Sequence, residues 1–404
     1  MVMSIRSVRS GFVLGIAACG LGLWVGAGEA PAVPATGPST APASTRVADM
    51  VEPTRISLHL KEVATEDAVA ELGKVAGLKF SVADAVWDAK GVAKSISFDV
   101  DEKPFWEVLL AMCDKSGLML LPAGYNAGGN LRIPLSAASQ YPSLPASVAK
   151  RPRMIYGPFM VTADSMQRVR NLGGDVSMRD AMTVQMTVYC EPRMRVGQMG
   201  QLAIDEAVDE NGLSLVAENG RGTLFYSGGN ARNWSYSLYA NLQVPAEAGR
   251  KIAHLKGKLP LVIITRMETL EFPDITTITE GVHKTLGDCT YTVSPLKAGA
   301  QKDSWELQVM IERDNALSGG REVGSSILQT SQLVDAEGNT WRGGGASGTG
   351  SPQKMTYQMT YFNQNFGGQV NDTKRHVPSK FVMEIPTQTR EMVVPVEFKD
   401  IPMP

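Results

Sequence analysis

The sequence predicts an α+β N-terminal module (β-α-β-β-α-β) followed by two homologous, mainly-β domains of the immunoglobulin-like sandwich kind. Three observations indicate this fold class. Strand and helix patterns repeat after 40 residues near the N-terminus, short motifs repeat after 126 residues further on, and apolar residues alternate along the later segments. The chain has 404 residues, more than one hydrophobic core usually fills, so several domains are expected.

The first 27 residues have the features of an export signal. Two arginines precede an apolar stretch that ends at Gly26 and is too short and too rich in glycine to span a membrane well. A cut after Ala27 would remove this segment. The alternative is lipid attachment at Cys19, which follows a lipoprotein-like Ile-Ala-Ala sequence. In both cases the expected location is the periplasm or the cell envelope, with association with the outer membrane as one option.

Composition then divides the rest of the chain. Residues 28–52 are rich in Pro, Ala, Ser and Thr, which is typical of a flexible tether. Residues 53–133 form the predicted α+β module, and the proline-containing stretch 134–153 is a predicted linker. The two β domains are expected at 154–275 and 276–404.

The module contains two copies of a strand–helix–strand pattern. The repeated residues lie 40 positions apart: Ile56-Ser57 and Ile96-Ser97, Glu62 and Glu102, Gly77-Leu78 and Gly117-Leu118. In each copy an alternating strand leads into a helix with one apolar face, and the glycine ends the helix in a left-handed conformation. We expect the two helices to pack on one small sheet.

This pattern resembles the short N-terminal domain shared by secretins and TonB-dependent receptors. The resemblance covers residues 53–133, and it implies a periplasmic module that docks an envelope protein partner. The remainder departs from both families, because no long series of amphipathic membrane strands follows. The resemblance therefore implies a docking module rather than a channel.

The remainder contains a second duplication. Residues 208–212 match residues 334–338, and residues 271–275 match residues 397–401, in both cases 126 positions later. Segments such as 184–190 alternate apolar and polar residues between turn-forming Gly, Asn and Asp, which favours antiparallel sandwiches. No family is assigned to this pair of domains.

An acidic cluster could offer oxygen ligands to Ca²⁺: Asp205, Glu206, Asp209, Glu210 and Asn211. The alternative is a hairpin turn at Asp209–Gly212. The second copy keeps Asp335 and Gly338 but has Ala336 and no counterpart of the preceding acidic pair. What recurs is turn chemistry, so the sequence favours the turn.

Gly343, Gly345 and Gly348 satisfy the G-x-G-x-x-G spacing of dinucleotide-binding loops. That motif works only between a strand and the start of a helix, and here Ser351 and Pro352 precede another strand-like segment. We therefore predict a flexible hairpin loop.

Histidines and cysteines show no metal-ligand spacing. The isolated histidines are His59, His254, His283 and His376. The cysteines left after signal removal are Cys113, Cys190 and Cys289. We predict an exposed His59 and three buried cysteines, with a Cys190–Cys289 bridge as the alternative.

Several aromatic residues are candidate binding anchors: Trp87, Trp106, Trp234, Trp305, Trp341, Tyr236 and Tyr239. Trp305 and Trp341 adjoin predicted strands and are expected in a core or at a domain junction. In the segment 233–239 the aromatic residues are expected to share one face, directed toward the core.

These observations favour a protein that binds other molecules. The net charge of −2 gives no basic surplus for nucleic acid. No catalytic motif is present, so we expect no enzyme activity, cofactor or metal. One alternative is an exported hydrolase of envelope polymers, which would need paired carboxylates in a groove. The other is a structural component of a secretion or surface assembly that joins through sheet edges.

Overall fold

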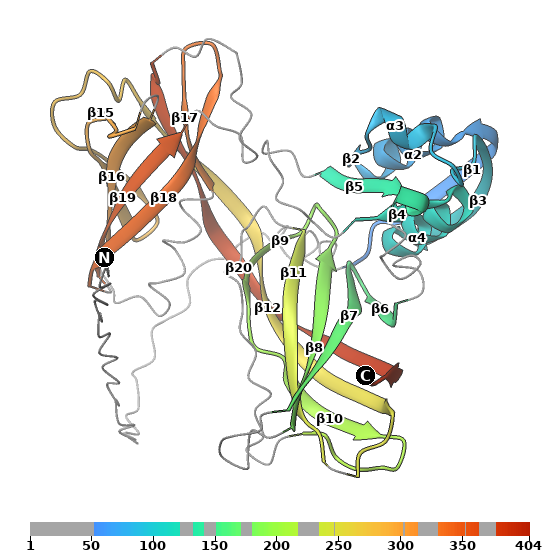
Figure 1. Cartoon of the computed structure of the whole chain (residues 1–404). Helices are drawn as coiled ribbons and strands as arrows, with labels where there is room; N and C mark the ends of the chain where they lie inside the picture. Colours follow the sequence, from blue (N-terminus) through green and yellow to red (C-terminus); the bar gives the residue numbers. More distant parts are fainter. Residues whose placement is uncertain are drawn as a thin grey trace, which may run out of the picture. The chain divides into compact units, whose positions relative to one another are not determined.

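A computed structural model describes residues 52–121, 132–140, 151–170, 180–216, 234–245, 247–301, 304–313, 330–351, 353–362 and 377–404. The predicted signal segment, Cys19, the predicted tether up to residue 51 and His376 lie outside the described residues. The chain is mainly β (Figure 1). No helix in the described ranges is both long and apolar enough to cross a bilayer.

The N-terminal module combines strands with helices and includes a short helix, α3 (Asp84–Trp87), that the sequence pattern does not predict. Its elements are β1 (Arg55–Ala64), α2 (Thr65–Ala76), β2 (Lys79–Ser81), α3 (Asp84–Trp87), β3 (Ser95–Pro104), α4 (Phe105–Ser116), β4 (Leu118–Leu120), β5 (Arg132–Ala137) and η1 (Ala138–Gln140).

Two expectations about the module are corrected. The described strands form two sheets rather than one, because β1 pairs with β3 and with no other described strand, while β5 lies between β2 and β4. The linker does not begin at residue 134, since residues 134–137 belong to β5, and Leu135 and Ala137 are buried in the module core.

The repeated serine and glutamate positions form reciprocal contacts between β1 and β3. Glu62 and Glu102 both adopt left-handed backbone angles, with φ of 52° and 49°. The Ser97 hydroxyl accepts a hydrogen bond from the Glu62 amide at 2.9 Å, and the Ser57 hydroxyl accepts one from the Glu102 amide at 3.0 Å. Each copy thus satisfies the irregular amide of the other, which explains why these residues recur.

The first group of β-strands forms two facing layers. One layer has the order β11-β8-β7-β6, and the other contains β9 and β10 with parts of two longer strands. The bounds are β6 (Arg153–Tyr156), β7 (Phe159–Arg170), β8 (Asp180–Cys190), β9 (Arg195–Met199), β10 (Ala203–Asp209) and β11 (Ser235–Gln243). Alternate residues of β8, including Val184, Met186 and Val188, are buried between the layers.

The second group resembles this arrangement, except that β18 pairs with both β17 and β19 and so joins its strands into one continuous sheet. The order β19-β16-β14-β13 corresponds to β11-β8-β7-β6, and β17 occupies the place of β10. The bounds are β13 (Val282–Leu286), β14 (Cys289–Val293), β15 (Lys297–Ala298), β16 (Ser304–Arg313), β17 (Ser331–Val334), β18 (Thr340–Gly350) and β19 (Lys354–Phe362). Its core includes Tyr291, Leu307 and Met359.

Two long strands run through both groups. β12 (Lys251–Pro273) and β20 (Lys380–Pro402) pair antiparallel along their whole length, from Lys251 opposite Pro402 to Pro273 opposite Lys380. Figure 1 shows them side by side from one group of strands to the other. At about 3.4 Å per residue, 23 residues span roughly 75 Å.

The long strands exchange their ends between the two cores. Phe272 of β12 is buried in the second core, whereas its repeat counterpart Phe398 of β20 is buried in the first. The predicted domain boundary at residues 275/276 is therefore wrong, because each core takes the end of a strand from the other half of the sequence. Two positions after these phenylalanines, Asp274 and Asp400 both adopt left-handed backbone angles, with φ of 55° and 54°.

Candidate functional site

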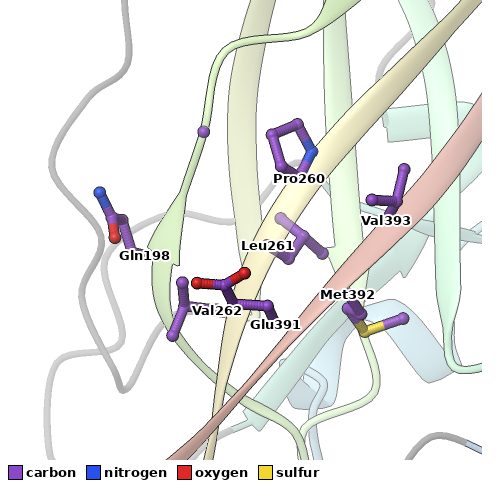
Figure 2. Close-up of a pocket in the computed structure, with 8 residues that line it drawn as sticks. Gln198, Pro260, Leu261, Val262, Glu391, Met392 and Val393 are labelled. Carbon is purple, nitrogen blue, oxygen red and sulfur yellow. The ribbon is translucent and has the colours of Figure 1, made fainter. Parts of the chain in front are cut away.

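A hollow of about 370 Å³ lies where β9 meets the β12–β20 pair (Figure 2). Three strands contribute its lining: Gln198, Gly200, Pro260, Leu261, Val262, Glu391, Met392 and Val393. Pro260 pairs across the strands with Val393, and Val262 pairs with Glu391. The hollow thus combines apolar walls with one carboxylate and one carboxamide.

Glycine allows β9 to lie close to β12 at this point. A Cβ on Gly200 would stand 2.6 Å from the Pro260 ring, and the Gly200 amide donates a hydrogen bond to the Pro260 carbonyl at 2.8 Å. Of the described strands, β9 pairs with β12 alone. Its second edge therefore carries backbone groups without a ladder partner in the part of the chain that the structure describes.

The hollow is suited to an apolar group that has a basic or hydrogen-bonding neighbour. Val393 is 50% exposed, an unusual degree for a valine in a strand beside a core. Glu391 is the one ionisable side chain in the lining, and Gln198 can donate or accept. These side chains can bind and orient a group through apolar contact, one negative charge and hydrogen bonding.

The acidic cluster forms a turn, as the sequence favours. One carboxylate oxygen of the buried Asp209 accepts hydrogen bonds from the amides of Asn211 and Leu213 at 2.9 and 2.8 Å. Its other oxygen accepts one from the Gly249 amide at 2.6 Å. Asp335 repeats the first pattern 126 residues later, with the amides of Glu337 and Asn339 at 3.0 and 2.8 Å.

The other members of the cluster also have protein partners. Glu210 accepts hydrogen bonds from the amides of Arg250 and Lys251 at 2.9 and 2.8 Å. Asp205 lies 3.2 Å from the Lys258 ammonium. In the described ranges, no group of three or more His, Cys, Asp or Glu side chains is arranged to hold a metal ion.

We expect the Asp209→Asn variant to lose a pH-dependent part of the stability. Backbone hydrogen bonds, the strongest from Gly249, hold the pKa of Asp209 below its ordinary value of 3.8. The stabilisation is therefore present above pH 3.8 and is lost as the pH falls through the lowered folded pKa. Urea midpoints of the variant and parent should differ at pH 7 and converge at acidic pH. Asp205→Asn is the control, and an equal gap at both pH values would contradict this account.

The glycine-rich segment is a strand, so the predicted hairpin loop is wrong. Residues of β18 pair in register with β19, as in Gly345 opposite Thr360 and Gly348 opposite Tyr357. A Cβ on Gly348 would stand 2.8 Å from the Tyr357 ring. The missing side chains therefore leave room for the aromatic rings of the neighbouring strand rather than for a nucleotide.

Two histidines have carboxylate partners that lie far away in the sequence. His59 is exposed, as predicted, and contacts Asp99, its cross-strand neighbour, at 2.6 Å. His254 of β12 lies between Glu206 and Glu397, at 3.3 and 3.1 Å. Its hydrogen bond to Glu397 lowers the pKa of that carboxyl. Sequence spacing could not reveal this trio, because its members come from three strands.

The three cysteines are free and buried, as predicted. Cys190 belongs to the first β core and Cys289 to the second, so the alternative of a bridge between them is wrong. Burial raises the pKa of Cys113 to about 12, which leaves the thiol protonated and unreactive at neutral pH.

An aromatic cluster joins the module to the first β group. Trp106 of α4 lies against Tyr189 and Trp234, with ring centroids 6.0 and 6.3 Å apart. The Trp106 indole donates a hydrogen bond to the Pro158 carbonyl at 3.0 Å. All three rings are buried, and burial raises the pKa of Tyr189 to about 12. Trp106 therefore anchors the module to the first β group.

The predicted direction toward the core is confirmed for Trp234 and Tyr236, but Tyr239 does not share it. Trp234 precedes β11 and is buried with the module, Tyr236 is buried in the first β core, and Tyr239 is exposed on the opposite face of the strand. As expected, Trp341 is buried in the second β core, and Trp305 packs against that core. Trp87 is half-buried at the module core.

A buried carboxylate strengthens the same junction. Glu191 accepts hydrogen bonds from the amide and hydroxyl of Thr54 at 3.0 and 2.5 Å, and from the Arg193 guanidinium at 2.8 Å. Sequence analysis missed Glu191 and Tyr189. The only available signal was a charged residue directly after the apolar end of a strand.

Comparisons with known proteins add little. No family model matches the chain, and no curated protein matches it. A crystal structure described as "the conserved domain protein from Bacillus anthracis" is 11% identical, with a TM-score of 0.17, over 61% of this chain and 89% of that chain. A similarity this low assigns neither fold nor function.

Proposed function

We propose that this chain is an exported, non-enzymatic envelope protein that binds a protein partner. The hollow beside β9 carries the proposal, because it places apolar groups and one carboxylate next to a strand edge without a ladder partner among the described strands. A partner segment could add to that edge as a further strand, with main-chain hydrogen bonds for affinity and the hollow for selectivity.

The partner segment should be extended and should carry an apolar residue next to a basic one. The apolar side chain would enter between Val262 and Val393, and the basic group would face Glu391. A charge-assisted hydrogen bond of this kind also fixes the register of the added strand.

The N-terminal module supports the same function. Its doubled strand–helix pattern is the basis of the resemblance to the docking domain of secretins and TonB-dependent receptors, and we extend that role to this chain as part of the proposal. The Trp106 and Glu191 contacts fix the module to the first β group, whose sandwich we propose to be immunoglobulin-like. A rigid junction lowers the entropic cost of presenting two surfaces to one partner.

Val393→Asp should abolish capture of the partner. The mature chain and the variant would be immobilised and exposed to the same envelope extract, and bound proteins would be identified by mass spectrometry. An aspartate would place a second negative charge beside Glu391 and fill the apolar wall with a polar group.

Val377→Asp is the matched control, because Val377 is 56% exposed and is not part of the hollow. Proteins retained by the parent and the control but lost with Val393→Asp would support the proposal. Recovery of the same proteins by all three chains, or of none by the parent, would contradict it.

A structural role remains the second candidate. The long antiparallel set of paired strands ends at β10 and β13, and neither terminal strand has a further partner among the described residues. Such edges could join chains into an assembly. A concentration-dependent polymer in size-exclusion chromatography would favour that role.

The hydrolase alternative is less favoured. The carboxylates Glu206 and Glu397, which both contact His254, are half-exposed and do not line the hollow beside β9.

A further inference from the structure

The outward face of the first β layer has an unusual composition. Three rows of side chains cross β7, β8 and β11: Ser165, Gln185 and Tyr239; Gln167, Thr183 and Asn241; Val169, Ala181 and Gln243. The alternate residues of β8 and β11 point the other way and are buried in the core, as in Met182, Val184 and Leu238. On β7 the alternate residue Met166 is half-buried, and Arg168 is exposed. With strands about 4.8 Å apart and alternate residues about 7 Å apart, the face measures roughly 10 by 14 Å.

None of these nine positions holds an Asp, Glu, Lys, Arg or His residue. Hydroxyl and carboxamide groups predominate, and cross-strand hydrogen bonds order them: Ser165 donates to Gln185 at 3.0 Å, and Thr183 donates to Asn241 at 2.9 Å. Asp164, which lies at a bulge in β7 next to Ser165 of the first row, is paired with Arg151 at 2.7 Å. The rigid core beneath holds this neutral, polar surface in place.

The second β group provides a comparison within the same chain. The corresponding layer carries an ion pair across β16 and β19, with the Lys354 ammonium 2.7 Å from the Glu312 carboxylate. Exposed sheet faces usually carry such charges, which maintain solubility and oppose edge pairing. Their absence from the three rows in the first group sets this face apart from its own repeat.

We propose that this face binds a neutral oligosaccharide or polysaccharide. A sugar chain presents many hydroxyl groups and no charge, and it matches a flat array of hydroxyl and carboxamide donors and acceptors. Tyr239, 37% exposed, offers an aromatic ring to the apolar face of one sugar ring, and Gln185 lies directly beside it on β8. Surfaces rich in Tyr, Ser and Asn bind through the same combination of rigid ring and adaptable polar groups.

Other ligand classes fit this face less well. Nucleic acids and acidic polysaccharides need basic side chains, and the nine positions have none. An apolar peptide would need a continuous apolar patch, whereas Val169 is the one aliphatic side chain of this face that reaches beyond Cβ. The lack of charged residues and the many hydroxyl and carboxamide groups of this face therefore favour a neutral sugar chain as its ligand.

The test is a calorimetric titration of the mature chain with two neutral probes, cellohexaose and maltoheptaose, and with heparin as the acidic probe. We expect one neutral probe to bind and Tyr239→Ala to weaken that binding at least tenfold. Gln185→Ala should weaken it severalfold, because a hydrogen-bonding group beside the ring is lost. Gln308→Ala is the control, since Gln308 is exposed on β16 of the second group.

Thermal unfolding would show that each variant is folded, which is expected because Tyr239 lies at the surface. No binding of either neutral probe at millimolar concentration would overturn the proposal. So would binding of heparin alone, or binding that Tyr239→Ala and Gln185→Ala leave unchanged. The proposed function stands independently, since Val393→Asp should leave the sugar titration unaffected.

Discussion

Gly117→Ala should be among the most destabilising single-methyl substitutions in the module, at about 3 kcal/mol or more. Gly117 ends α4 with a left-handed φ of 72°, which by itself costs an alanine about 1–2 kcal/mol. In addition, the new Cβ would overlap the Gly91 carbonyl oxygen, so backbone would have to move. The measurement is the urea midpoint and slope of the variant against the parent.

Gly77→Ala is the matched control, because the repeat supplies the same conformation without the clash. Gly77 ends α2 with φ of 67°, and a Cβ there would meet nothing within 4 Å. We expect this variant to lose about 1–2 kcal/mol, the conformational part alone. Equal losses at the two glycines would contradict the close approach of the segment around Gly91 to the end of α4.

Trp106→Ala should cost about 3–5 kcal/mol and should loosen the module from the first β group. The substitution removes a fully buried ring from the cluster with Tyr189 and Trp234, and it leaves the Pro158 carbonyl without its indole donor. Amide hydrogen exchange would show which parts of the chain the substitution destabilises. Amides of the module and of the adjoining end of β8 should exchange faster than in the parent.

Trp341→Ala is the control for general loss of stability, because Trp341 is buried in the second β core. This variant should speed exchange in β17 and β18 and leave the module amides close to their parent rates. Similar exchange patterns in the two variants would mean that the junction is not a local contact of Trp106.

Local patterns in the sequence predicted most elements but not how they combine. Alternation predicted strands such as β8 and β19, and Gly77 and Gly117 marked the helix ends, because these signals depend on neighbouring residues. The two offsets also predicted recurring turns, including the paired contacts of Asp209 and Asp335.

Long-range pairing was beyond those signals. The sequences around Phe272 and Phe398 predict two similar strands. No pattern among neighbouring residues indicates that each strand ends in the core of the other half of the chain. The hollow beside β9 is hidden for the same reason, because Gln198, Val262 and Glu391 come from strands far apart in the chain. The β18 glycines were misassigned since strand signals depend on side chains that glycine lacks.

A chain that ended at Ile275 would carry an unfinished first β group. It would lack Val394, Val396 and Phe398, which fill that core, while its own Phe272 would project without the core that receives it. Two such half-length molecules could each donate the end of β12 to the other and complete two copies of the first core as a two-fold homodimer. The two β groups of the full chain are arranged like the halves of such a dimer joined covalently, so neither half is expected to persist as a folded monomer.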